Sequence, residues 1–236
     1  MEKTEKNYNL FEESSSACQD EFVCKILKNK QHGTFLEIGS AWPKKYSNTY
    51  ILEKNLNWRG VGIEYNDKWR NEWKTIRPNT KLYINDARRV DYGKLLNDNN
   101  MPEKIDYLSF DIEAENGSTI EALDQLDKTA LNKYKFGIVT FEHDIYRGDF
   151  FDTRNRSRKI FKKHGYILTY PDVTNLGLEK RTLCGYKGSD PYEDWYFHPD
   201  IIDINLINKL IQPINNNVVP FGNLGGMNSR DIINML

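Results

Sequence analysis

The chain has 236 residues, 39% hydrophobic and 28% charged, which is the balance of a folded globular protein with one sizeable core. Its formal net charge of -1 supplies no overall positive field, so binding of nucleic acid would need a local basic patch. No apolar run approaches the ~20 residues that span a bilayer, and the acidic N-terminus lacks the order of a signal peptide. We therefore expect a cytoplasmic protein that does not contact membranes.

One domain is expected over residues 16–212. Residues 1–15 are polar and predict a loose N-terminal arm. Residues 213–236 are rich in turn-forming Asn and Gly, and we expect this segment to pack on the domain or to serve in oligomerisation.

Short β-rich runs alternate with amphipathic segments from about residue 20 onward. This alternation predicts an α/β fold with a doubly wound, mostly parallel sheet and helices on both faces. The predicted strands cover residues 33–40, 60–65, 81–85, 105–112, 136–142 and 166–170. Ligands of such sheets bind at the carboxyl edge of the strands, so the residues that follow each strand are the candidate site.

The first two strands end in residues suited to a cofactor that contains adenosine. Glu37 can pair with an ammonium group, and Gly39, followed by Ser40, lets the backbone approach a ligand closely. Glu64 comes 25 positions after Gly39, close to the spacing at which an acid binds the two ribose hydroxyls in Rossmann-like folds. The segment after Gly39 lacks the further glycines of a dinucleotide site, which favours S-adenosylmethionine, a cofactor without phosphate.

The third strand is followed by Asp86 and Ala87. The Asp86 carboxylate can accept from the adenine amino group while the Ala87 amide donates to the ring. A turn capped by the Asp86 side chain explains the same residues equally well.

The fourth and fifth strands end in side chains that can move protons or bind a metal. Asp111 follows the fourth strand, and Glu142 and His143 end the fifth. We expect these three side chains to converge above the sheet, with His143 as general base. Asp111 and Glu142 would orient His143, or all three would bind a divalent cation such as Mg²⁺.

These residues stand in motifs that together resemble the FkbM family of S-adenosylmethionine-dependent methyltransferases. The resemblance runs from about Gln19 to Ile202. Its motifs are residues 19–23, 33–39, 47–50, 52–54, 58–64, 77–79, 105–113, 142–143, 194–196 and 198–199.

The resemblance implies a class I methyltransferase fold and transfer to a hydroxyl of a small-molecule or glycan acceptor. It further implies that Glu37, Gly39, Ser47 and Asn48 surround the amino acid end of the cofactor. Glu64 would then bind the ribose, and Asp86 with Ala87 the adenine.

Two alternatives remain open. The acceptor would be RNA if the basic segment 154–163 holds phosphates, although the slightly negative net charge argues against this. The chain would be a catalytically inactive cofactor-binding domain if Pro43, which stands where the family usually has a second Gly, alters the cofactor loop. Aromatic residues such as Trp42, Trp195 and Tyr196 are expected in loops, where they either roof the acceptor pocket or anchor the loops to the core.

Overall fold

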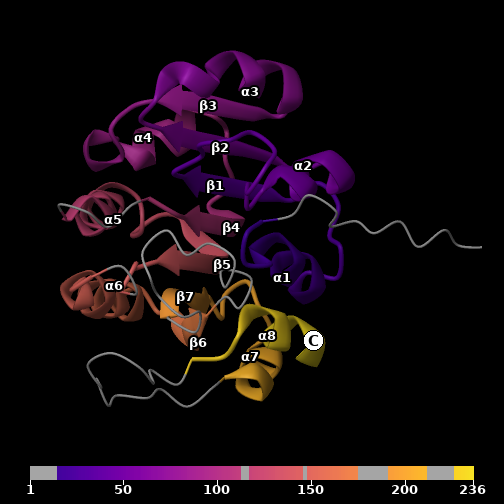
Figure 1. Ribbon diagram of the computed structural model, residues 1–236, viewed down its shortest axis with the longest axis vertical. Coiled ribbons are helices and arrows are strands. Elements are labelled where there is room, and N and C mark those ends of the chain that lie inside the picture. The colour runs from indigo at the N-terminus through magenta and orange to yellow at the C-terminus, as the bar shows by residue number, and fades with distance from the viewer. Residues whose placement is uncertain (1–14, 113–116, 146–147, 175–190, 212–225) are drawn as a thin grey trace, which may run out of the picture.

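The computed structural model describes residues 15–112, 117–145, 148–174, 191–211 and 226–236 (Figure 1). Within these residues a single sheet is formed by β1 (Thr34–Ile38), β2 (Arg59–Glu64), β3 (Thr80–Ile84), β4 (Lys104–Phe110), β5 (Lys135–Glu142), β6 (Ile167–Thr174) and β7 (Pro191–Phe197). The strand order is β3-β2-β1-β4-β5-β7-β6. The first five strands pair in parallel, and β7 is antiparallel to both of its neighbours.

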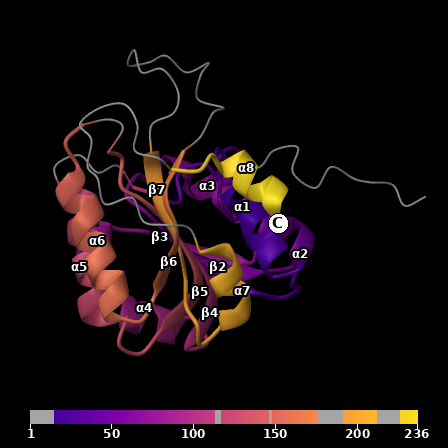
Figure 2. The same cartoon turned by 90° about the horizontal axis from the view of Figure 1, so that it is seen from below.

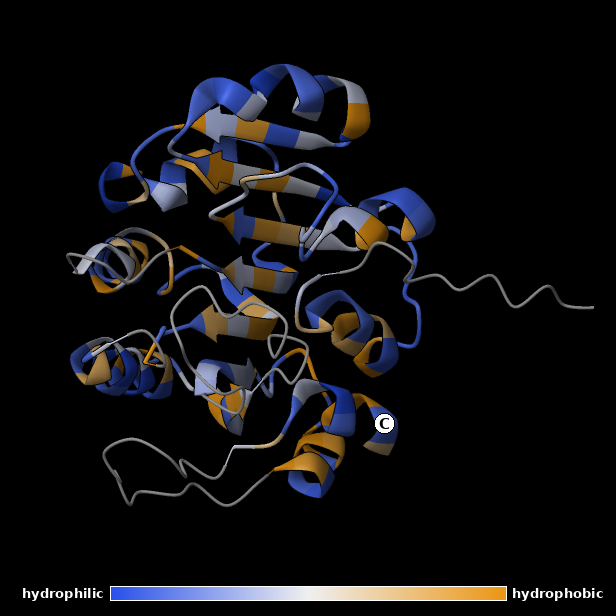
Figure 3. Ribbon diagram, in the orientation of Figure 1, coloured by the Kyte–Doolittle hydropathy of each residue, from blue (hydrophilic) through white to orange (hydrophobic). Residues whose placement is uncertain are grey.

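Helices cover both faces of the sheet (Figure 2). One face carries α4 (Tyr92–Asp98), α5 (Ser118–Thr129) and α6 (Phe151–Lys163), and the other carries α1 (Gln19–Ile26), α2 (Tyr50–Leu56), α7 (Ile204–Leu210) and α8 (Ser229–Met235). At the β3 end of the sheet lie α3 (Arg70–Ile76) and the 3-10 turn η1 (Asp67–Trp69), which are largely hydrophilic (Figure 3). A second 3-10 turn, η2 (Ala87–Arg89), follows β3.

The sheet separates two hydrophobic cores. Leu108 and Phe141 face the core under α4, α5 and α6, whereas Tyr107 and Ile138 face the core under α1, α2, α7 and α8. Consecutive residues of a strand point to opposite faces, so strands buried on both faces have nearly continuous apolar sequences. The predicted doubly wound α/β fold is confirmed, and all six predicted strands are present with shifted ends.

Strand β7 was missing from the sequence prediction. Its sequence contains Glu193 and Asp194, two acids that interrupt the apolar pattern of a buried strand. The fold tolerates them because Tyr192 donates to Glu193 at 2.6 Å and Arg158 donates to Asp194 at 2.6 and 2.7 Å. Trp195 and Tyr196 therefore lie buried in this strand, and the expectation that they lie in loops was wrong.

The described C-terminal residues return to the N-terminal side of the domain. Arg230 of α8 donates to Glu21 of α1 at 2.7 Å, and Asn228 forms an isolated bridge with Thr174. Residues 1–14 of the predicted arm and residues 213–225 of the predicted C-terminal segment lie outside the described residues. No helix in the described part of the chain has the length and apolarity needed to cross a membrane.

Candidate active site

A cavity of about 700 Å³ opens at the carboxyl edge of β1, β2, β3 and β4. The strand order reverses between β1 and β4, and such a switch point is where open α/β sheets bind ligands. Of the predicted site residues, five line the cavity: Gly39, Glu64, Asp86, Ala87 and Asp111. Acids from strands far apart in the chain are thus gathered on one rim.

Gly39 makes the closest backbone contact of this rim. Its φ is +91°, and a Cβ at this position would lie 1.8 Å from the carbonyl oxygen of Asp111. The Gly39 amide donates to Ile63 at 2.9 Å, and the Asp111 amide donates to Ile38 at 2.9 Å. Only glycine fits this approach of the β1 and β4 ends, and the exposed backbone beside it is available to a ligand.

Glu64 lies at the end of β2 with both carboxylate oxygens facing backbone amides. One oxygen accepts from Ala41 at 2.9 Å and the other from Asn66 at 2.7 Å. Each oxygen keeps a second lone pair that can accept from a hydroxyl. The next residue, Tyr65, lines the cavity with 79% of its surface exposed, and the sequence reasoning missed it. A large aromatic side chain directly after a strand-end acid is the signal that could have found it.

Asp86 is held by its neighbour Arg88 in a bidentate ion pair, with contacts of 2.9 and 2.8 Å. Its side chain also accepts from the Arg88 amide at 3.0 Å and so caps η2, which is the turn-capping role considered for it. The Arg88 guanidinium holds the pKa of Asp86 below its usual range. Arg88 itself lines the cavity and was not predicted. An adenine role for Asp86 and Ala87 stays a prediction.

Glu37, Ser40, Ser47 and Asn48 are buried and are not among the residues that line the cavity. Glu37 accepts from Ser47 at 3.4 Å and from Thr49 at 2.9 Å. Asn48 donates to Asp111 at 3.1 Å, and Ser40 donates to the Glu37 carbonyl at 3.2 Å. Burial raises the pKa of Glu37 to about 7. These four residues therefore form a buried network that contacts the cavity lining through Asp111.

Arg77 anchors this buried network and was given no role by the sequence reasoning. Its guanidinium is 1% exposed and donates to the Pro43 carbonyl at 3.1 Å, to Ser47 at 3.1 Å and to Thr49 at 2.7 Å. Glu53 balances the charge at 2.7 Å. The loop that contains Pro43 is thus tied to the end of α3. No sequence pattern shows that an arginine turns inward in this way.

The structure brings Asp111 and Glu142 together at the ends of β4 and β5. Burial, together with the neighbouring carboxylates of Asp111 and Asp144, holds the pKa of Glu142 well above its ordinary value. Adjacent acids that cannot all ionise share protons, which is a property suited to proton transfer.

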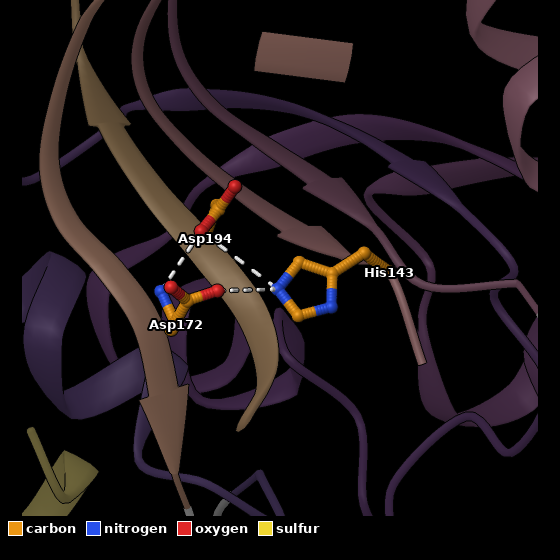
Figure 4. A group of neighbouring side chains, drawn as sticks. All are labelled: His143, Asp172 and Asp194. Carbon is orange, nitrogen blue, oxygen red and sulfur yellow. Dashed lines mark hydrogen bonds and ion pairs between the residues drawn. The ribbon is translucent and has the colours of Figure 1, made fainter. Parts of the chain in front are cut away.

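His143 does not join Asp111 and Glu142, and the predicted catalytic and metal-binding trio is not formed. The imidazole is fully buried, and its Nε2 lies 3.6 Å from Asp172 and 3.7 Å from Asp194 (Figure 4). β5 ends at Glu142, and the chain turns at His143 and Asp144, so the His143 side chain enters different surroundings from that of Glu142.

His143, Asp172 and Asp194 are near enough to bind a metal, with ligand atoms within 4.8 Å of one another. Two arginines of α6 already neutralise the acids: Arg154 contacts Asp172 at 2.6 and 2.5 Å, and Arg158 contacts Asp194 at 2.7 and 2.6 Å. A divalent cation here would add two positive charges beside two buried guanidinium groups. The donor set does not fit a metal.

The same contacts bear on whether the basic segment 154–163 can bind phosphates. Arg154 is buried and Arg158 is mostly buried, whereas Arg156 pairs with Asp124 at 2.6 Å and Lys163 with Asp127 at 2.9 Å. Acids of the same domain therefore neutralise most of the charge that the segment would need to hold RNA phosphates.

Comparisons with known proteins give similarity at the level of the fold. No family model matches the chain, and no curated protein matches it. Precorrin-6y C5,15-methyltransferase from Geobacter metallireducens is 16% identical, with 75% of this chain and 86% of that chain covered and a TM-score of 0.48. A TehB-like SAM-dependent methyltransferase from Corynebacterium glutamicum is 11% identical over 75% and 86%, with a TM-score of 0.46. TrmK from M. capricolum, in complex with S-adenosylhomocysteine, is 13% identical over 75% and 66%, with a TM-score of 0.41.

The mostly parallel seven-stranded sheet with an antiparallel β7 is the predicted class I methyltransferase fold. Membership of the FkbM family stays a prediction, because no family model matches the chain.

Replacement of Gly39 by Ala should destabilise the protein much more than the same change at Gly117. Both glycines have positive φ, so both variants lose about 1–2 kcal/mol to backbone strain. At Gly117 the nearest atom to the new Cβ is 4.0 Å away, whereas at Gly39 the β1 and β4 ends must separate. Urea unfolding of the two variants measures the difference. Equal losses would show that the close approach to Asp111 is absent.

Stability should fall as the pH rises from about 5 to about 8. Burial raises the pKa of Glu37 to about 7 and that of Glu193 to about 8, so the folded protein binds more protons than the unfolded chain in this range. Each carboxyl contributes up to about 1.4 kcal/mol per pH unit. Chemical denaturation across this range measures the slope. The variants Glu37→Gln and Glu193→Gln should each flatten it, and an unchanged slope in both would contradict the assignment.

Proposed function

We propose that the protein is an S-adenosylmethionine-dependent methyltransferase. The observation that carries this proposal is the cavity at the β1/β4 switch point, where the Gly39 backbone, Glu64, Asp86 and Asp111 meet. Its volume of about 700 Å³ lies in the range of small-molecule sites and leaves room for a cofactor.

The lining residues divide by chemistry along the rim. Glu64 presents two acceptor oxygens for the ribose hydroxyls. Tyr65 offers an exposed aromatic face against which adenine can stack, next to Asp86 and Ala87. Glu37, which is held by Ser47 and Thr49 behind the lining residues, supplies negative charge for the ammonium group of the cofactor when its carboxyl ionises.

The cofactor supplies an electrophilic methyl group, and the acceptor in this proposal is a hydroxyl of a small molecule or glycan. A hydroxyl must lose its proton as it attacks, and Glu142, beside Asp111, is the group placed to take that proton. Asp111 lines the cavity and orients the reacting groups. His143 is not the base in this proposal, because its imidazole lies in the ion-pair network of Asp172 and Asp194.

No specific observation favours either alternative, an RNA acceptor or a catalytically inactive cofactor-binding domain. The arginines required for RNA are paired within the domain, and Arg77 ties down the Pro43 loop. A divalent cation is not part of the proposal.

Isothermal titration calorimetry should detect binding of S-adenosylmethionine and S-adenosylhomocysteine to the wild-type protein. Replacement of Glu64 by Gln should weaken both by roughly 10- to 150-fold, because a charged hydrogen-bond acceptor for the ribose contributes about 1.5–3 kcal/mol. The matched control is Glu72→Gln, which alters an exposed acid on α3. Absence of binding to the wild type would defeat the proposed function.

The acceptor panel holds sugars, glycan fragments and amines without hydroxyls. Methyl transfer from labelled S-adenosylmethionine to the sugars and glycan fragments should fall about 10²–10⁴-fold in Glu142→Gln, the range expected for loss of a general base. Cofactor affinity should stay unchanged in this variant. The control is Glu103→Gln, an exposed acid before the N-terminal end of β4. Full activity of Glu142→Gln would remove Glu142 from the reaction, and labelling only of acceptors without hydroxyls would overturn the acceptor class.

A further inference from the structure

The chain turns sharply where β5 leaves the sheet. The amides of His143 and Asp144 both donate to the carbonyl of Tyr192, at 2.8 and 3.1 Å. Asp144 has a φ of 57°, which is uncommon for a residue with a side chain. This turn decides where the carboxyl groups of Glu142 and Asp144 lie relative to Asp111.

The His143 imidazole contacts the turn on one side and the ion-pair network on the other. Its Nδ1 accepts from the Ile145 amide at 3.5 Å, a contact that favours the tautomer with the proton on Nε2. The Nε2–H faces the Oδ1 atoms of Asp172 and Asp194, at 3.6 and 3.7 Å (Figure 4). Within the described residues Nε2 has no hydrogen-bond partner, so no acceptor other than this carboxylate pair holds it.

The two carboxylates that face the imidazole are themselves held firmly. Arg154 and Arg158 of α6 bind them, and the Asp172 amide donates to Asp194 at 2.9 Å. Asp172 adopts a φ of 56° at a bulge of β6, a strained conformation that persists only where surrounding contacts enforce it. The network is thus a fixed point against which the end of β5 can be oriented.

We propose that His143 is a positioning residue: its imidazole fixes the 142–145 turn against the Asp172–Asp194 pair and so sets the separation of the Glu142 and Asp111 carboxyls. The proposal rests on the proposed methyltransferase function, in which Glu142 takes the acceptor proton. It differs from a role of His143 as base, because the fully buried imidazole has no path to an acceptor while the network is closed.

Three variants separate these roles. His143→Gln keeps an N–H donor that reaches the carboxylates but cannot take a proton. His143→Asn keeps an amide near the Nδ1 position, but it is too short to place a donor at the Nε2 position, and His143→Ala keeps no polar group. If His143 is a positioning residue, His143→Gln should keep the wild-type titration of Glu142. If His143 is the base, Gln cannot replace it, because an amide does not take up a proton.

The measurement is the titration of the Glu142 carboxyl by ¹³C NMR in glutamate-labelled protein, with the signal assigned through Glu142→Gln. In wild type, burial and then the carboxyl groups of Asp111 and Asp144 keep the pKa of Glu142 raised, while Glu193 and Tyr192 of the neighbouring β7 also face it. In His143→Ala the carboxyls separate, and the pKa of Glu142 should move down toward its ordinary value. In His143→Gln it should stay at the wild-type position. The ¹⁵N spectrum of His143 should show a protonated Nε2 and an unprotonated Nδ1.

Wild-type titration of Glu142 in a folded His143→Ala protein would overturn the proposal. A second pair of results would also overturn it: a Glu142 pKa in His143→Gln as low as that in His143→Ala, together with wild-type His143 ¹⁵N shifts that change over the same pH range as the Glu142 carboxyl. Those results would assign the transferred proton to the imidazole. Should His143→Ala fail to fold, His143→Asn serves in its place. Affinity for S-adenosylmethionine should agree within about twofold among the folded proteins. Absence of cofactor binding to the wild type would defeat the proposed function. The titration of Glu142 would still show whether His143 fixes the 142–145 turn.

Discussion

The contact of Gly39 with the carbonyl of Asp111 is the constraint on which the candidate site depends. A side chain at residue 39 would collide with this backbone at 1.8 Å, so the ends of β1 and β4 can approach only with glycine. Gly39 and Asp111 line the cavity at the switch point together with Glu64 and Asp86, and Glu142 lies beside Asp111 at the end of β5. A wider gap would move Asp111 away from the other lining residues.

Two inward-facing groups of arginines keep the edge of the sheet in place. Arg77 binds the loop after β1, and Arg154 with Arg158 binds the acids of β6 and β7. Buried ion pairs gain little net stability over apolar packing, but removal of one partner leaves an uncompensated charge and is costly. Such networks therefore favour a single arrangement of the segments that they join. Arg77 joins the loop after β1 to the end of α3, and Arg154 with Arg158 joins α6 to β6 and β7.

The buried acids near the cavity divide into two electrostatic classes. Asp194 is surrounded by cationic and hydrogen-bonding groups, which hold its pKa below the usual range. Burial raises the pKa values of Glu37 and Glu193 in spite of their hydrogen-bond partners, and at Glu142 the neighbouring carboxyls add to the effect of burial. Acids of the first class serve structure. Those of the second class respond to a cationic ligand, because a positive charge nearby favours their ionised forms.

The strands β1 to β6 and the acids at the ends of the first five could be predicted from the sequence, since apolar runs and strand-end residues are local patterns. Those patterns placed Gly39, Glu64, Asp86, Ala87 and Asp111 on one rim, and the structure confirms that placement. The direction of a side chain at the last turn of a strand is not a local property. Glu142 and His143 are neighbours in the chain, but the charges that surround them come from different elements: β4 for Glu142, and α6, β6 and β7 for the network beside His143. Only the tertiary structure could show that the histidine lies beside an ion-pair network, that Arg154 and most of Arg158 in the basic segment are buried, and that Glu193 and Asp194 belong to a strand.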